Sequence, residues 1–419
     1  MSKKPWMTSD TLVSAVQRKI SMPVNQATFS VDDILAFADE EMVVSQVPSI
    51  MVYNEEYFVT TKVVPLEENV TRYPIPERAI GMKLRDVAYA DSQGNLSEMT
   101  RLSPDNKTYF QDSMSSFNSS AKAFYLEGND LVISPNGGSN LTGYLVFYYY
   151  LRPNQLVQDS HANIVDSFQA YITVDNSNLT DGDTLTIADV VFTAVSSSPV
   201  DNEFLIDATS ILTATNLMTV INASSLDMSA NNNSTAIVDL DFTDIELMLQ
   251  PISSTFAGAV SSRLSSTSDG LVVGDNAAVV FEEEIDQDLY TVGDLADFLE
   301  TSGGHRTLGL DIEIQDISLD KMEFTLTEIP LKLVVGDYVC SQYECIIPQI
   351  PSDLHSGLAE RTSARILASI GDQQGLATVN TKIGEINQTQ GTLLDNRVEG
   401  APLKINNQHS LLRYSRNRR

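Results

Sequence analysis

The sequence predicts an α+β protein: the N- and C-terminal segments form a helical bundle, a small antiparallel β region lies between them, and a β-rich domain is inserted. Apolar residues recur with a helical period near both ends of the chain and with a period of two in between. The charge is equally uneven. Within a net charge of -30, the stretch from Asp166 to Glu328 carries 29 acidic residues against Arg263, Arg306 and Lys321. This pattern indicates an ordinary core interrupted by a strongly acidic insert.

The composition narrows the class of protein. The 419 residues are 42% hydrophobic, which suits two or three globular domains. No apolar run approaches the roughly 20 residues that span a bilayer, and the N-terminal stretch is polar and amphipathic, so we expect no membrane contact and folding in a cytoplasm. A charge this negative argues against wrapping nucleic acid, because affinity for DNA comes mainly from Lys and Arg on phosphates.

Residues 1–62 are expected to hold the N-terminal helices of the core. Ser9 and Asp10 can cap the first helix, whose apolar residues follow helical spacing. Pro23 should end it, because proline cannot continue a helix.

Two further helical stretches are expected in the same segment. Ser30, followed three residues later by Asp33, resembles a capping box in which Asp replaces the usual Glu. The next stretch should follow Pro48 and continue to Phe58.

Residues 63–160 are predicted to form the antiparallel β region. A compact hairpin is expected around 128–130, where Gly128 or Asn129 can take a positive φ. The aromatic run Phe147–Tyr150 would alternate in a strand, with two rings in the core and two in a subunit contact. A stacking platform for bases is the alternative use of the outer rings.

Residues 161–329 are predicted to fold independently as an acidic, β-rich module. Its first strand is expected at 170–174, followed by a turn at 181–183. Spacing predicts a short helix over 213–223 and another around 292–299. Further strands are expected at 184–187, 190–193, 203–206, 236–242, 270–273 and 277–281.

The chain then returns to the core. Residues 330–350 are expected to form a return strand or loop, and 351–400 the C-terminal helices, the first of them stopped at Gly371. A weaker polar helix should follow over 375–394, and residues 401–419 form an extended basic tail.

No residue pattern predicts catalysis. The chain has no nucleophile elbow, and we expect Cys340 and Cys345 to lie in strands or loops rather than in a zinc site. The cluster from Glu282 to Asp288 could hold calcium or magnesium, but it lacks EF-hand spacing, and a run of like charge is usually a solvated face. Paired carboxylates for glycosidase chemistry cannot be selected from 56 acidic residues. We therefore expect no enzyme activity, no cofactor and no metal ligand.

Segments of the two flanks resemble virion structural proteins of tailed phages. The motifs include Asp33-Ile-Leu-Ala-Phe-Ala-Asp-Glu-Glu-Met42, Arg72-Tyr-Pro-Ile-Pro-Glu-Arg-Ala-Ile-Gly81, Tyr149-Tyr-Leu-Arg-Pro-Asn154 and Pro351-Ser-Asp-Leu-His-Ser-Gly-Leu-Ala-Glu-Arg-Thr362. The chain is similar to head-to-tail adaptors, or neck connectors, over about residues 9–158 and 330–405. The acidic insert lies outside that pattern and is similar to a small β-rich module of phage particle proteins, used there for decoration or contact.

The resemblance implies a structural role in the neck of the virion. Such adaptors form a ring beneath the portal, with twelvefold symmetry, and the DNA passes through the ring without specific binding. The implied partners are copies of the chain, the portal protein and the next ring protein of the tail or neck. The residues expected to dock on the portal are Leu411, Leu412, Arg413, Tyr414, Arg416, Arg418 and Arg419.

Two alternatives remain open from the residues themselves. The basic tail could bind nucleic acid rather than fold on docking to a protein. The whole chain could instead be a tail fibre, a spike or a host-surface glycan-binding protein, with the acidic module as its working part.

Overall fold

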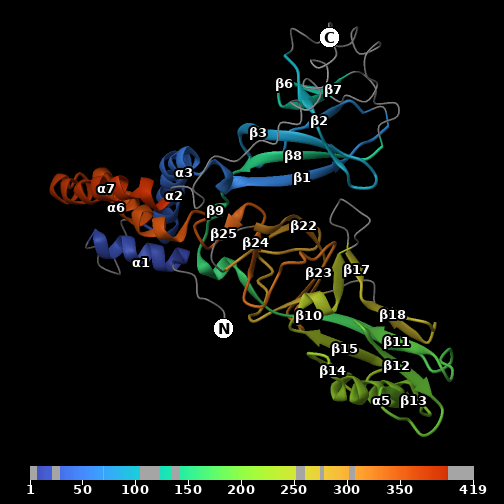
Figure 1. The fold of residues 1–419 in the computed structure, drawn as a ribbon. Helices are drawn as coiled ribbons and strands as arrows, with labels where there is room; N and C mark the ends of the chain where they lie inside the picture. Colours follow the sequence, from blue (N-terminus) through green and yellow to red (C-terminus); the bar gives the residue numbers. More distant parts are fainter. Residues whose placement is uncertain are drawn as a thin grey trace, which may run out of the picture.

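A computed structural model of the chain describes residues 7–20, 29–68, 70–103, 123–134, 142–251, 260–273, 278–301 and 307–394. Helices from both ends of the chain lie together, a β region stands beside them, and the acidic segment extends away from them (Figure 1). Helices and many antiparallel strands are both present, so the predicted α+β class is confirmed.

The N-terminal helices differ from the prediction at the start of the first one. The elements are α1 (Ser9–Lys19), α2 (Val31–Glu41), the π turn η1 (Met42–Gln46), α3 (Val47–Tyr53) and the 3-10 turn η2 (Glu55–Phe58). The predicted cap by Ser9 and Asp10 was wrong, because Thr8 holds the cap position and makes no side-chain cap bond. Ser9 is buried, and its N–H donates to Ile346 O at 2.7 Å, so a tertiary contact satisfies one N–H of this helix end. Pro23 lies outside the described residues.

The predicted capping box at the start of α2 is confirmed. The N–H of Asp33 donates to Ser30 Oγ at 3.1 Å, and the N–H of Ser30 donates to Asp33 Oδ2 at 2.9 Å. The stretch expected after Pro48 begins earlier, since α2, η1 and α3 continue into one another. Pro48 has no N–H, and in an α-helix its ring would clash with the carbonyl of Val44; the wider π turn relieves that clash.

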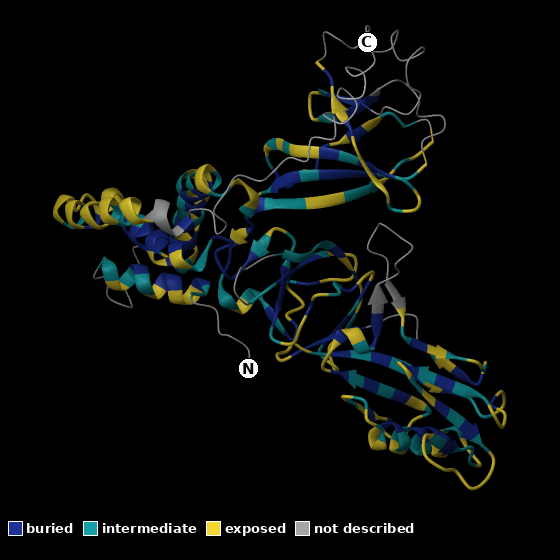
Figure 2. Cartoon of the chain, in the orientation of Figure 1, coloured by how far each residue is buried: buried dark blue, intermediate teal, exposed yellow. Residues whose placement is uncertain are grey.

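The C-terminal helices pack against the N-terminal ones. After η6 (Ser352–Leu354) comes α6 (His355–Ile370), which ends at Gly371 with φ +78°, as predicted, and then α7 (Gln373–Leu394). α6 lies against α1, α2 and α7, and most of α7 is exposed (Figure 2). The shared core includes Leu12, Val16, Ile34, Leu35, Leu358 and Ile366.

Two four-stranded sheets form the β region. Its strands are β1 (Val59–Pro65), β2 (Arg72–Pro74), β3 (Ala79–Ala90), β4 (Leu96–Glu98), β5 (Thr100–Arg101), β6 (Ala123–Glu127), β7 (Asp130–Ser134) and β8 (Tyr144–Leu151). The strand orders are β1-β8-β3-β4 and β2-β7-β6-β5. The predicted hairpin is confirmed between β6 and β7, where Gly128 takes φ +64°.

The aromatic run lies in β8. Phe147 and Tyr149 are buried in the core of the β region, as predicted. Tyr150 alternates to the other side, where its hydroxyl donates to Glu55 and Lys83 Nζ lies 4.7 Å from its ring centroid. Tyr150 is only 1% exposed within the chain, so the subunit contact expected of this ring was wrong; the contact expected of Tyr148, which is partly exposed, stays a prediction.

The acidic segment consists mainly of strands. After β9 (Gln155–Leu156) and η4 (Asp159–His161) come β10 (Asn163–Val174), β11 (Thr184–Ile187), β12 (Val190–Val195), β13 (Glu203–Leu205), α5 (Ser210–Ala223), β14 (Met228–Asn231), β15 (Ile237–Phe242), η5 (Ile245–Leu247), β16 (Leu249–Pro251), β17 (Val260–Ser262), β18 (Leu264–Ser266), β19 (Leu271–Val273), β20 (Ala278–Phe281), β21 (Leu295–Leu299), β22 (Thr307–Ser318), β23 (Glu323–Leu326), β24 (Tyr338–Ser341) and β25 (Glu344–Cys345). The predicted short helix is confirmed as α5, which packs on β13, β14 and β15.

The largest sheet connects the acidic segment to the chain that follows it. Its order is β14-β15-β10-β20-β23-β22-β21-β24. β10 also pairs with β24, so the six strands from β10 to β24 in this order form a closed barrel. β24 lies beyond position 330. The sheet therefore includes residues on both sides of that position.

The helix predicted around residues 292–299 was wrong. Leu295–Leu299 form β21, which pairs with β22 and β24. Residues 296–299 are all fully buried, Asp297 among them. A strand covered on both faces loses the apolar–polar alternation of a half-exposed strand, and its apolar run then resembles a buried helix.

Candidate functional site

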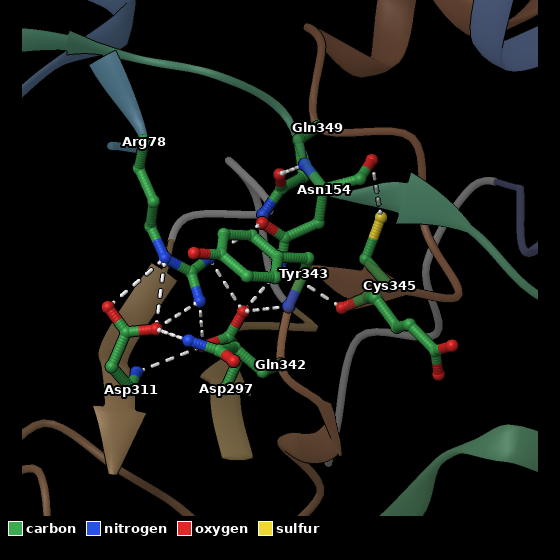
Figure 3. Close-up of polar contacts among 9 residues, drawn as sticks. Arg78, Asn154, Asp297, Asp311, Gln342, Tyr343, Cys345 and Gln349 are labelled. Atoms are coloured by element: carbon green, nitrogen blue, oxygen red, sulfur yellow. Dashed lines mark hydrogen bonds and ion pairs between the residues drawn. The ribbon is translucent and has the colours of Figure 1, made fainter. Parts of the chain in front are cut away.

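Arg78 is the centre of a buried polar cluster between the β region and the acidic segment (Figure 3). It directly precedes β3 and is 5% exposed. Its guanidinium forms a two-bond pair with Asp297 of β21, with Nη1–Oδ2 at 2.8 Å and Nη2–Oδ1 at 2.9 Å. Its Nε donates to both oxygens of Asp311 on β22, at 3.1 and 3.2 Å. One cation thus joins segments more than 200 residues apart.

Three other side chains complete the cluster. Asn154, between β8 and β9, accepts from Arg78 Nη1 at 3.2 Å and donates to Asp297 Oδ2 at 2.8 Å. Gln342 Nε2 donates to Asp311 Oδ1 at 2.6 Å. The ring of Tyr343 lies against the guanidinium, with its centroid 4.1 Å from Cζ. Each guanidinium nitrogen therefore has a carboxylate or amide partner.

Two residues of the cluster have a left-handed backbone. The φ angle is +58° at Asp311 and +69° at Tyr343, in a region that residues with a Cβ atom rarely adopt. The backbone N–H groups of both residues donate to the Asp297 carboxylate, at 3.1 and 3.0 Å. Such geometry costs about 1–3 kcal/mol per residue and persists only where the surroundings enforce it. The buried carboxylate supplies that enforcement here.

Burial and pairing have opposite effects on the charges of the cluster. Burial raises the pKa of Asp297, against the opposing influence of Arg78 and the N–H donors. Burial would also raise the pKa of Asp311, but the hydrogen bonds from Arg78 and Gln342 lower it. Desolvation disfavours the charged guanidinium, yet the two carboxylates raise the pKa of Arg78. Donors and acceptors are directed at one another, which is the geometry of a structural junction.

The chain around Arg78 also matches a known family. Residues 7–175 match the family model described as SU10 adaptor protein. The chain is similar to phage head-to-tail adaptors. The resemblance noted in the sequence is thereby confirmed, and the match extends from α1 through β10. It includes Arg78 and Asn154 but ends before Asp297 and Asp311. No curated protein matches the chain.

The adaptor match identifies a class of structural proteins of the phage particle. This agrees with the expected virion location and with partners among the head and tail proteins. In the ranges described, no helix is long and apolar enough to cross a membrane.

Ion pairs connect α6, which lies outside the matched residues, to the other helices. Glu360 pairs with Lys19 of α1 and lies 3.9 Å from Lys382 of α7. Arg365 pairs with Glu40 and Glu41 at the end of α2. α6 is therefore held to helices from both ends of the chain by charge as well as by its core residues.

Asp39 of α2 is a partly buried carboxylate beside the linker that leads into the acidic segment. Its Oδ1 accepts from the N–H of Leu156 at 3.1 Å. Burial raises the pKa of Asp39 to about 7, and that hydrogen bond opposes the shift. The group therefore changes charge near neutral pH.

The residues expected to dock on the portal, Leu411, Leu412, Arg413, Tyr414, Arg416, Arg418 and Arg419, lie outside the described residues. The carboxylates of the cluster at 282–284 are exposed, and Asp286 Oδ1 accepts from the N–H of Asp288 at 2.9 Å. Among the residues that the structure describes, no three His, Cys, Asp or Glu side chains are grouped to hold a metal ion.

Both cysteines lie in strands, as predicted. Cys340 is in β24 and Cys345 is in β25, and both are buried free thiols. Burial raises the pKa of each thiol well above its usual range.

The Arg78 cluster was missed in the sequence. One signal was present, because Asp297 interrupts the apolar run Leu295–Leu299, and a charge inside a buried strand needs a partner. The sequence gives no indication of which of its 26 basic residues that partner is.

Proposed function

We propose that the protein forms a ring that joins the portal vertex of the capsid to the tail and provides a conduit for DNA. The adaptor family match over residues 7–175 carries this proposal. A cyclic ring requires each copy to bind its neighbours through two different surfaces. The proposed partners are copies of this chain, the portal protein and the next ring protein of the tail or neck. A copy number of twelve rests on the resemblance alone.

The proposed division of labour follows the predicted domains. Segments 1–62 and 351–400 would form the helical bundle of the ring, with the β region 63–160 beside it. The contacts of α6 with α1 and α2 support a bundle drawn from both ends of the chain. Segment 161–329 would be the inserted domain, and 330–350 the return to the core.

The inserted domain is proposed to point away from neighbouring copies. It holds 29 acidic residues and three basic ones, so two such domains would repel within about a Debye length of 8 Å at physiological ionic strength. In Figure 1 its distal part, with α5 and β11 to β13, extends away from the helices, which supports this arrangement. A lumen lined by acidic residues of the core would let DNA pass without adhering.

The tail 401–419 is proposed to dock on the portal. Ending the chain at Asn406 removes all seven docking residues and four of the tail's arginines. The shortened chain is expected to bind purified portal more weakly while its circular dichroism and melting temperature stay unchanged. Arg72→Ala in the full chain is the control, since Arg72 is an exposed arginine of β2. Undiminished portal binding by the shortened chain would contradict the docking role.

A further inference from the structure

An exposed apolar stripe runs along the continuous helix formed by α2, η1 and α3. Val44, Pro48 and Val52 follow one another at intervals of four residues, and Val44 and Val52 are 71% and 79% exposed. Val43 and Tyr53 flank them, at 44% and 47%. We call these five residues the valine stripe. Residues four apart lie above one another on a helix, so the three central side chains form a single line.

The other side of this helix is already in use. Met42, Val47 and Ile50 are buried at 3% exposure or less in the helical core. Single exposed valines are normal on a protein surface, but a line of apolar side chains over consecutive turns is typical of a contact surface. The stripe therefore needs an occupant that its own helix packing does not supply.

The surroundings of the stripe are acidic. From Val31 to Phe58 the chain has seven acidic residues and neither lysine nor arginine. Glu40 lies one turn before Val44, and together with Glu41 it shares a single cation, Arg365. Two more glutamates, Glu55 and Glu56, lie just beyond Tyr53, after Asn54. An apolar occupant that also carries basic side chains would match both features.

The chain itself contains such a segment. Residues 401–419 include five lysines and arginines and no acidic residue. Leu411, Leu412 and Tyr414 stand among the arginines, so apolar and basic side chains are interleaved. The stripe and this segment are complementary in both polarity and charge.

The segment is also within reach of the stripe. α7 packs against α3 and ends at Leu394, which is buried in the same helical core as Val47 and Ile50. From Leu394 to Leu411 an extended chain reaches up to about 55 Å, at roughly 3.3 Å per residue. This reach is longer than the whole helix that carries the valine stripe, because the helix from Val31 to Tyr53 rises only about 1.5 Å per residue.

We infer that, in the absence of portal, residues 411–419 cover the valine stripe of their own chain, with the leucines and Tyr414 on the valines and the arginines beside the glutamates. This inference rests on the proposed function, because the same residues are proposed to dock on the portal. Transfer of the tail to the portal would then uncover the stripe for a neighbouring copy. The covered stripe would keep free copies apart, and ring formation would wait for the portal.

The test uses the burial of both native cysteines. Cys340 and Cys345 are the only cysteines of the chain and are buried, so Val52→Cys supplies one accessible thiol on the stripe. Its rate of maleimide labelling is measured in the full chain, in the chain ending at Asn406, and in the full chain with the tail arginines 413, 416, 418 and 419 changed to Glu. Labelling is expected to be several-fold slower in the full chain than in the other two. The protection should not change with protein concentration.

Val292→Cys is the matched control, because Val292 is 60% exposed in the acidic segment and should label at one rate in all three backgrounds. Equal labelling of Val52→Cys in all three would overturn the inference, and protection that grows with protein concentration would assign the cover to a second copy instead. Portal binding by the same shortened chain separates the two proposals. If the shortened chain no longer binds portal but Val52→Cys labels equally in all three backgrounds, only the covering of the stripe by the tail is rejected. If the shortened chain binds portal unchanged, the docking role of the tail is rejected.

Discussion

Arg78 combines full burial with three kinds of contact: paired carboxylates, an amide and an aromatic face. A buried ion pair adds little net stability over an apolar replacement of the same shape, because desolvation offsets the attraction. Removing one partner is different, since the charges left behind stay buried and unpaired. Asp297 is fully buried, and its carboxylate accepts from the backbone N–H groups of Asp311 and Tyr343. Removing Arg78 should therefore disturb both of these segments.

Arg78→Ala is therefore expected to destabilise the protein by about 3–5 kcal/mol, the usual cost of leaving a buried charge without its partner. Arg72→Ala is the matched control, because Arg72 pairs with Glu127 on the surface and should cost less than about 1 kcal/mol. Urea unfolding of both variants measures the difference. Equal midpoints for the two variants would mean that the junction contributes no more than a surface pair.

Asp39 makes the stability of the helices depend on pH. Its pKa in the folded protein is about 7, above the ordinary value of 3.8, so the folded state binds the proton more tightly between these values. The free energy of unfolding therefore falls as the pH rises from about 4 to about 7, by at most about 1.4 kcal/mol per unit from this group. Above pH 7 the cost of the buried charge is fully present.

Asp39→Asn is expected to be more stable than the unmodified protein at pH 8 and to lose that advantage as the pH falls towards 4. The amide can still accept from Leu156, but it carries no buried charge. Urea midpoints at pH 5 and pH 8 measure the change, with Glu385→Gln on the exposed side of α7 as control. A variant that is less stable at pH 8 would mean that the carboxylate is needed in its charged form.

The capping box of α2 and the end of α6 could be predicted from the sequence because their causes are local. Ser30 and Asp33 are three residues apart, and Gly371 directly follows its helix, so each signal stands in a short window. β21 could not be predicted, since its burial comes from residues distant in the sequence: Ala296 and Phe298 pack in the core of the acidic segment, and Leu299 packs in the helical core. The Arg78 cluster belongs to the same class of contact: its partners meet only after the chain has folded.

Gly143, directly before β8, is a position whose residue type is set by a distant segment. Its φ is +131°, and a Cβ atom there would lie 2.2 Å from the carbonyl oxygen of Ala90 at the end of β3. The close approach of these two strands therefore requires glycine. Pairing of β3 with β8 forms the middle of the first sheet of the β region.

Gly143→Ala is expected to lower the free energy of unfolding by at least about 1–3 kcal/mol, from backbone strain and the contact with Ala90. Gly384→Ala is a control of opposite sign, because Gly384 is exposed in α7 with nothing within 4 Å of the added Cβ. It should gain about 0.5–1 kcal/mol from helix propensity. Thermal melts of both variants measure these changes in stability. An unchanged melting temperature for Gly143→Ala would show that β3 and β8 can move apart at this point without cost.

The distribution of charge and apolar surface over the whole molecule favours assembly on a template. A net charge of -30 makes copies repel, and most of that charge lies in one segment. The valine stripe has five residues, few beside the roughly 20–30 residues that each partner contributes to a stable protein interface. Ring formation by free copies would therefore be weak, and a portal that binds several copies side by side would raise their local concentration.

The mass of the purified protein, measured by light scattering alone and after mixing with its portal, tests the central claim most directly. The adaptor proposal predicts a monomer by itself and a ring of copies on the portal, visible by negative-stain imaging. A stable trimer that is indifferent to the portal would contradict it, and would indicate a tail fibre or spike whose acidic segment binds the ligand.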